Sequence, residues 1–142
     1  MKENTVDILL VEDDEVDVMN VQRAFKKNHI NNTLHIAGNG LEALALLRGD
    51  DKTQKLIPRP KIILLDLNMP KMNGIEFLQV LRKDPELKSL SVFVLTTSGD
   101  ERDVIAAHQL NVAGYILKPI ELECFIQALA TLNLYWSLIE MP

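Results

Sequence analysis

The sequence predicts an α/β fold in which a parallel five-stranded sheet is covered by helices on both faces. Short apolar runs alternate with stretches of helical periodicity along the whole chain, a pattern typical of doubly wound parallel sheets. The apolar runs are continuous, as in Ile62–Leu65, which indicates strands buried on both faces. Two of these runs end on acidic residues, at Glu12 and at Asp66. Because chemistry in such sheets gathers at the carboxyl ends of the strands, these acids are candidate site residues.

Length and composition indicate one soluble domain spanning residues 1–142. The net charge of −5 disfavours nucleic acid and anionic membranes as direct partners. The single cysteine, Cys124, cannot form an internal disulfide and fits a reducing cytosol. Charged residues near the N-terminus interrupt the apolar segment that a signal peptide requires. No apolar run approaches the ~20 residues of a membrane span. We therefore expect a cytoplasmic protein.

The first third of the chain predicts two strands and two helices. The apolar run Asp7–Val11 forms the first strand, and the acidic residues after it lead into a helix at Val16–Lys27. We interpret Asp14 as a cap of this helix, where a carboxylate complements the helix dipole. A strand at Leu34–Ala37 and a helix at Gly40–Leu47 follow.

The middle of the chain holds the longest connection and the third strand. The charged connection Gly49–Pro60 is long for a compact domain, and a mobile surface loop is favoured over a partner-binding element. The third strand is predicted at Ile62–Leu65, and Pro70 breaks the backbone before a helix at Gly74–Lys83. We interpret Met72, in the intervening turn, as a packing residue.

The last third predicts two strands and two helices. Strands at Val92–Thr96 and Gly114–Leu117 flank a helix at Glu101–Leu110, and a final helix spans Leu122–Ile139. We expect the flavodoxin-like strand order 2-1-3-4-5, whose switch point lies between the first and third strands. Only the final helix follows Lys118, so no output domain is expected.

Three acids, Glu12, Asp13 and Asp66, converge at the switch point of this predicted sheet. Two like charges ~4 Å apart repel by ~1–4 kcal/mol, so the cluster requires a cation or raised pKa values. A set of hard oxygen ligands suits Mg²⁺, with Mn²⁺ as the alternative. No histidine or cysteine lies nearby in the sequence to favour zinc.

The fourth and fifth strands bring a hydroxyl and an ammonium group to the same edge. Thr96 ends one strand, and Lys118 leaves the other directly before Pro119, which restricts the lysine to extended geometry. A carboxylate, a hydroxyl, an ammonium group and a divalent cation together make a phosphoryl-transfer site. Asp66 is the best candidate nucleophile, because it lies centrally and its backbone leads into the turn.

Five motifs, in this order and at this spacing, resemble the response-regulator receiver domains of two-component signalling. They are Glu12-Asp13, Asp66 with Pro70 and Gly74, Thr96, Tyr115, and Lys118-Pro119. The resemblance covers essentially the whole chain. It implies a signalling protein rather than an enzyme, which assists its own phosphorylation and dephosphorylation but has no small-molecule substrate beyond phosphodonors.

The resemblance also implies a role for each acid. Asp66 is the phosphoacceptor, and a sensor histidine kinase is the phosphodonor. Asp13, Asp66 and the backbone carbonyl of Asn68 bind the metal ion, while Glu12 contributes through a water molecule. The phosphoryl group would add roughly −1.5 to −2 charges at the edge of the sheet.

Three further residues take stabilising and switching roles by the same resemblance. Thr96 supplies the hydroxyl that follows the phosphoryl group, and Lys118 the cation bonded to it. Tyr115 is the aromatic residue whose rotamer reports the state, with plain packing as the alternative. Phosphorylation then shifts the face formed by the fourth helix, the fifth strand and the last helix toward protein–protein signalling.

Within the family, the chain is most similar to the stand-alone regulators of cyanobacterial and bacterial phytochromes. Three features carry this similarity: the charged loop before Pro58-Arg-Pro60, the Leu95–Ser98 segment, and the ending Tyr135–Pro142. The similarity implies a phytochrome-type or hybrid histidine kinase as phosphodonor.

The end of the last helix is apolar nearly all round, which requires burial on both sides. We predict a homodimer or a kinase-docking surface there, with folding back over the domain as the alternative. The predicted face consists of Tyr115, Tyr135, Trp136, Leu138 and Ile139.

Two other classes compete with a phosphoacceptor. A degenerate receiver scaffold is disfavoured because the acids, Thr96 and Lys118 are all intact. A haloacid-dehalogenase-type phosphatase needs a second aspartate two residues after the nucleophile, where this chain has Asn68, and it needs a cap that no segment here can supply.

Overall fold

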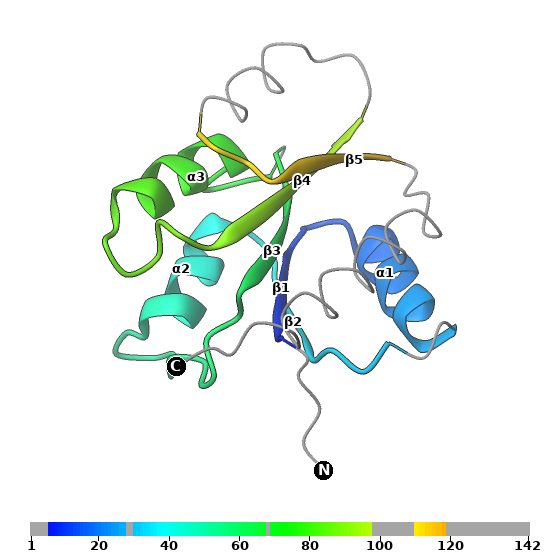
Figure 1. Cartoon of the computed structure of the whole chain (residues 1–142), viewed down its shortest axis with the longest axis horizontal. Helices are drawn as coiled ribbons and strands as arrows, with labels where there is room; N and C mark the ends of the chain where they lie inside the picture. Colours follow the sequence, from blue (N-terminus) through cyan, green and yellow to red (C-terminus); the bar gives the residue numbers. More distant parts are fainter. Residues whose placement is uncertain (1–5, 28–29, 68, 98–109, 119–142) are drawn as a thin grey trace.

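Five parallel strands form one sheet in the order β2-β1-β3-β4-β5, with helices on both faces (Figure 1). This is the strand order predicted from the sequence. The computed structural model describes residues 6–27, 30–67, 69–97 and 110–118, and for residues 96–97 and 116–118 only the backbone. The elements are β1 (Ile8–Val11), α1 (Glu15–Lys27), β2 (Leu34–Ala37), α2 (Gly40–Arg48), β3 (Ile62–Asp66), α3 (Gly74–Lys83), β4 (Ser91–Thr97) and β5 (Gly114–Lys118).

Each observed element ends within one residue of its prediction. The strands β3 and β5 extend to Asp66 and Lys118, because the ladder of β4 continues past the apolar runs: Asp66 pairs with Leu95, and Lys118 with Thr97. The helices predicted at 101–110 and 122–139 lie outside the described residues, apart from Leu110, which is in a turn. None of the described helices is long and apolar enough to cross a membrane.

The helix α1 begins at Glu15 because Asp14 caps it. The Asp14 Oδ1 atom accepts hydrogen bonds from the backbone nitrogens of Val16, at 2.8 Å, and Asp17, at 3.3 Å. These bonds satisfy two of the donors that a helix leaves open at its amino end. The structure thus confirms Asp14 as a capping residue.

The core lies on both faces of the sheet, which explains why the strands are continuously apolar. Successive strand side chains point to opposite faces. Leu9 and Val11 of β1 pack with Phe77 of α3 on the face covered by α2 and α3, whereas Ile8 and Leu10 pack on the face covered by α1 (Figure 1). All four β1 side chains are fully buried. The sheet is therefore fixed on both faces, and its strand ends are held in place.

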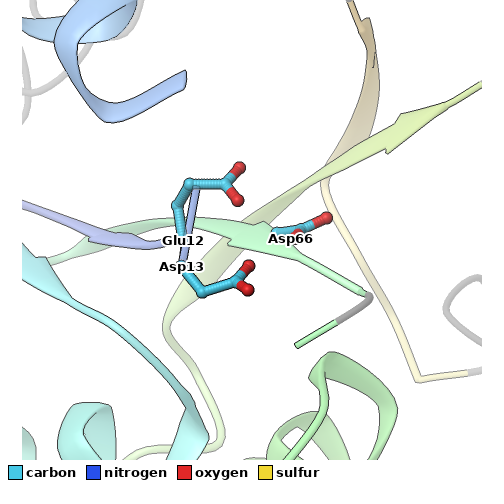
Figure 2. Close-up of side chains that lie close together, drawn as sticks. All are labelled: Glu12, Asp13 and Asp66. Carbon is cyan, nitrogen blue, oxygen red and sulfur yellow. The ribbon is translucent and has the colours of Figure 1, made fainter. Parts of the chain in front are cut away.

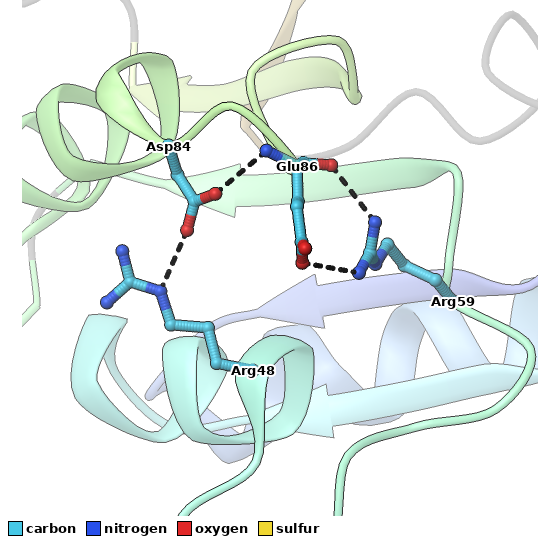
Figure 3. Close-up of polar contacts among 4 residues, drawn as sticks. All are labelled: Arg48, Arg59, Asp84 and Glu86. Carbon is cyan, nitrogen blue, oxygen red and sulfur yellow. Dashed lines mark hydrogen bonds and ion pairs between the residues drawn. The ribbon is translucent and has the colours of Figure 1, made fainter.

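The long connection between α2 and β3 is bonded to the rest of the domain, in part to residues that are far from it in the sequence. Arg59 donates from Nη1 to the backbone oxygen of Glu86, at 3.0 Å, and pairs with its carboxylate, at 3.4 Å (Figure 3). Next to it, Arg48 Nε donates to Asp84 Oδ2 at 3.0 Å. In addition, the backbone nitrogen of Leu56 donates to the oxygen of Leu46, at 2.9 Å. The loop predicted to be mobile is therefore attached to the rest of the chain through Arg59 and Leu56, and the Arg48–Asp84 pair joins the ends of α2 and α3 beside it.

Asp84 gives this network a measurable pH dependence. The backbone N–H of Glu86 donates to Asp84 Oδ1 at 2.9 Å and, with the bond and charge of Arg48, lowers the pKa of the Asp84 carboxyl. A carboxylate with a lowered folded pKa stabilises the fold above its unfolded pKa, ~3.9, and loses that contribution as the pH falls through the folded value.

We therefore expect Asp84→Asn to lower the free energy of unfolding by a constant amount at neutral pH, and by progressively less below about pH 4. Urea unfolding between pH 3 and 7 measures this gap. Arg48→Gln is the matched control and should retain most of the pH dependence, because the bond from Glu86 remains. A gap of equal size at pH 3 and pH 7 would contradict the assignment.

Candidate functional site

The three predicted acids meet at the carboxyl ends of β1 and β3. Carboxylate oxygens of Glu12, Asp13 and Asp66 all lie within 4.8 Å of one another. Figure 2 shows the three side chains extending from the two neighbouring strand ends. Glu12 and Asp66 are buried, with 2% and 6% of their surface exposed, while Asp13 is exposed. The cluster therefore has a buried base and one side open to solvent.

Hydrogen bonds distinguish Asp14 from the other two acids that follow β1. The Glu12 nitrogen donates to the Ala37 oxygen at 2.9 Å, which continues the β1–β2 ladder by one residue. Glu12 Oε2 accepts a bond from the backbone nitrogen of Asp14 at 3.2 Å. Asp14 caps α1, so its side chain belongs to the helix, whereas Glu12 and Asp13 belong to the cluster.

The donor set fits a hard divalent cation. Mg²⁺ binds oxygen ligands at about 2.0–2.1 Å, so two ligands on opposite sides of the ion lie about 4.2 Å apart. The three carboxylate oxygens lie within 4.8 Å of one another, close enough for one ion to be shared between the side chains. Among the described residues the cluster contains only carboxylates. That composition suits Mg²⁺ or Mn²⁺ rather than zinc.

The turn after Asp66 brings the start of α3 into close contact with the end of β3. The nitrogen of Gly74 donates to the Leu67 oxygen at 2.9 Å, and a Cβ at Gly74 would lie 2.6 Å from the Asp66 backbone oxygen. A capping box closes the helix start: Asn73 Oδ1 accepts from the Glu76 nitrogen, and Glu76 Oε1 from the Asn73 nitrogen. Only glycine allows this close approach, which fixes the backbone that presents Asp66.

The backbone places the remaining candidates in register with Asp66. Asp66 pairs with Leu95, so Thr96 follows directly at the same edge, and Thr96 in turn pairs with Leu117, next to Lys118. The side chains of Thr96 and Lys118 are outside the described part of the chain. The same holds for Asn68, Pro119 and the predicted face residues Tyr135, Trp136, Leu138 and Ile139.

Tyr115 lies on β5 opposite Val94 and is half-buried. Its side chain packs against the core cluster between the sheet and the α2–α3 face. Burial raises the pKa of the Tyr115 phenol, because the charged form would lose hydration. The phenol is therefore neutral at physiological pH.

Sequence reasoning missed two contacts, one beside the site and one at the opposite edge of the sheet. Gly40, at the start of α2, donates its N–H to the oxygen of Met72 in the turn that follows Asp66. Arg82, in the last turn of α3, bonds several backbone oxygens near the start of β5. The only sequence signal for the first was a glycine after the capping residue Asn39, and the second had none.

In sequence and in fold the chain is similar to response regulators. Residues 8–130 match the response regulator receiver domain. The chain is 40% identical over 129 residues to the response regulator Rcp1 of Synechocystis, which covers 91% of this chain and 87% of Rcp1. It superposes on the Mn²⁺-bound form of Rcp1 with a TM-score of 0.77 at 38% identity, covering 96% of this chain and 99% of that one.

The phosphorylated cyanobacterial phytochrome response regulator RcpA is similarly close, with a TM-score of 0.78 and 34% identity over 97% of this chain and 99% of that one. The matches include β1, β3, β4 and β5, the strands whose ends form or border the acid cluster. The chain therefore belongs to the response regulator receiver domain family and is related to the regulators of phytochromes.

Proposed function

We propose that this chain is a phosphoacceptor switch in which Asp66 receives a phosphoryl group from a sensor histidine kinase. Receiver domains accept phosphoryl groups from histidine kinases and are not classical enzymes. The observation that supports Asp66 is its place in the three-acid cluster, at the end of the central strand β3. A carboxylate oxygen of Asp66 attacks the phosphorus of a phosphohistidine, the P–N bond breaks, and an acyl phosphate forms on Asp66.

The cluster would hold Mg²⁺ or Mn²⁺, as receiver domains do at their acidic pocket. Asp13, Asp66 and the backbone carbonyl of Asn68 are the proposed ligands, with Glu12 acting through a water molecule. When bound, the ion supplies positive charge to the oxygens of the transferred group. The burial of Glu12 and its bond from the Asp14 nitrogen keep this carboxylate oriented beside the cluster.

Thr96 and Lys118 are the proposed partners of the phosphoryl group once it is on Asp66. The Lys118 ammonium balances its charge, and the Thr96 hydroxyl donates a hydrogen bond to one of its oxygens. Movement of Thr96 and Tyr115 then shifts the face formed by β5 and the helices predicted on either side of it. The backbone register, which brings Thr96 and Lys118 to the strand ends beside Asp66, supports both roles.

The relatives support a proposal for the phosphodonor, the location and the assembly of this protein. Their phytochrome association supports a phytochrome-type or hybrid kinase as the phosphodonor in the cytoplasm. Residues 1–142 act as a single receiver domain, and a homodimer forms through Tyr115 on β5 and the predicted last helix, with Tyr135, Trp136, Leu138 and Ile139. A protein–protein contact at this face is the proposed output.

Intact mass spectrometry after incubation with acetyl phosphate tests the proposal. We expect the wild type to gain one phosphoryl group, ~80 Da, only when Mg²⁺ is present, and Asp66→Asn to gain none. Asp14→Asn is the matched control, because Asp14 follows the cluster in sequence but caps α1, and this variant should still be phosphorylated.

A mass gain that persists in Asp66→Asn would move the phosphoacceptor to another residue. If the wild type gains no mass, a stable phosphate mimic shows whether rapid hydrolysis removes the group. A wild type that binds neither the phosphoryl group nor the mimic would be a scaffold rather than a switch.

A further inference from the structure

We propose that Gly40 and Met72 are positioning residues for the phosphoacceptor site, an inference that rests on the proposed function. They lie where the β2–α2 corner, residues Ala37–Gly40, meets the turn that follows Asp66. This corner has one hydrogen bond to Glu12 of the acid cluster and one to Met72, in the turn that follows Asp66. It therefore sets how far the Glu12–Asp13 pair lies from Asp66.

The first bond holds the acid pair. The backbone nitrogen of Glu12 donates to the oxygen of Ala37 at 2.9 Å, one residue beyond the Val11–Ala37 pair that ends the β1–β2 ladder. The backbone just before Asp13 is thereby fixed to the start of the corner. A shift of the corner would pass directly to both acids.

The second bond holds the turn. The backbone nitrogen of Gly40 donates to the oxygen of Met72 at 3.0 Å. A Cβ at Gly40 would lie 2.6 Å from Met72 Cγ, 2.9 Å from Sδ and 3.0 Å from Cβ. These distances are shorter than van der Waals contact allows, so any larger residue at this buried position would push Met72 away.

Hydrogen bonds hold the β2–α2 corner in place, so the corner cannot easily move to relieve a clash between residue 40 and Met72. Asn39, with 5% of its surface exposed, caps α2 by accepting a bond from the Glu42 nitrogen at 3.0 Å. The Glu42 carboxylate in turn accepts bonds from the Gly38 nitrogen at 3.1 Å and from Asn39 Nδ2 at 3.2 Å. Displacement is therefore directed into Met72 and the turn that follows Asp66.

Gly40→Ala tests this inference, with Mg²⁺ as the probe. We expect calorimetry on the folded full chain to show Mg²⁺ binding about 10-fold weaker, at the lower end of the losses seen when groups around a metal site are displaced. Phosphorylation by acetyl phosphate should slow by a similar factor. Gly114→Ala is the matched control: Gly114 starts β5, at the edge of the sheet opposite the acids, and its Cβ would lie 3.3 and 3.4 Å from ring carbons of Phe93, so its Mg²⁺ affinity should stay within about 2-fold of wild type.

The double variant Gly40→Ala/Met72→Ala identifies the obstruction. Removing Cγ and Sδ of Met72 frees the space, and we expect Mg²⁺ affinity to return to within about 3-fold of wild type. If Gly40→Ala does not fold, Met72→Ile crowds the same contact from the turn and should weaken Mg²⁺ binding in the same direction.

Two outcomes separate this inference from the proposed function. A Gly40→Ala protein that loses stability in urea but binds Mg²⁺ as wild type does would make Gly40 merely structural and overturn the inference. A wild type that binds no Mg²⁺ and accepts no phosphoryl group would overturn the proposed function instead.

Discussion

Replacing Arg82 by alanine is expected to lower the free energy of unfolding by about 3–5 kcal/mol, because four carbonyl oxygens lose a charged donor. Arg82 donates from Nε to the oxygen of Leu110 at 2.6 Å and from Nη2 to that of Asn111 at 2.9 Å. Its Nη1 atom donates to the backbone oxygens of Lys88, at 2.7 Å, and Leu90, at 3.0 Å. Hydrogen bonds to charged groups contribute ~1.5–3 kcal/mol each, but water can hydrate the exposed acceptors when the arginine is removed, so the expected loss is smaller than the sum of four bonds.

The position of these acceptors explains why the loss should be large. Two lie before β4 and two lie before β5, so a single guanidinium joins the connections that lead into both strands. Asn111 is held at a positive φ of 62°, a conformation that the bond to its oxygen helps to maintain. Burial lowers the pKa of Arg82, because the charged guanidinium loses hydration, but the group remains charged at neutral pH.

Equilibrium urea unfolding of three variants separates geometry from charge. Arg82→Lys keeps the charge but cannot reach four acceptors from one planar group, and it should recover less than half of the loss. Arg23→Ala, which removes an exposed arginine from α1, should change stability by less than ~0.5 kcal/mol. Full recovery with lysine would show that charge alone is sufficient, contrary to this account.

The sequence predicted the fold and the acid cluster because both depend on short-range patterns. Continuous apolar runs identified the strands, and the chain order of strands and helices gave the sheet order. The ends of β3 and β5 were missed by one residue, since the ladder continues through Asp66 and Lys118 after the apolar pattern stops. The cluster followed once β1 and β3 were taken as neighbours.

The long-range contacts between elements could not be predicted in this way. Met72 was interpreted as a packing residue, and nothing in its neighbours indicates that its oxygen meets Gly40, 32 positions earlier in the sequence. The Arg48–Asp84 pair likewise joins residues 36 positions apart. Such contacts depend on how α2 packs beside α3, which periodicity does not specify.

Replacing Gly74 by alanine is expected to cost about 3 kcal/mol of stability and to weaken Mg²⁺ binding, because the obstruction here is backbone. A Cβ would lie 2.6 Å from the Asp66 oxygen and 2.7 Å from Leu67 Cα, and neither atom can rotate away. Relief requires α3 to move off the end of β3 or the Asp66 backbone to shift. Either movement also strains the bond from the Gly74 nitrogen to the Leu67 oxygen.

Urea unfolding and Mg²⁺ calorimetry on the same variants give the contrast with Gly40. Gly114→Ala is the control: its Cβ would lie 3.3 and 3.4 Å from ring carbons of Phe93, which can tilt, so the loss should stay below ~1 kcal/mol. In the Gly40→Ala protein, truncating Met72 to alanine should restore Mg²⁺ affinity, because the obstructing atoms belong to a side chain. At Gly74 truncating Leu67 to alanine should not, because Leu67 Cδ2, at 3.0 Å, is farther than the two backbone atoms. A Gly74→Ala/Leu67→Ala protein that regained wild-type Mg²⁺ affinity would show that the side chain, and not the Asp66 backbone, limits the approach of α3.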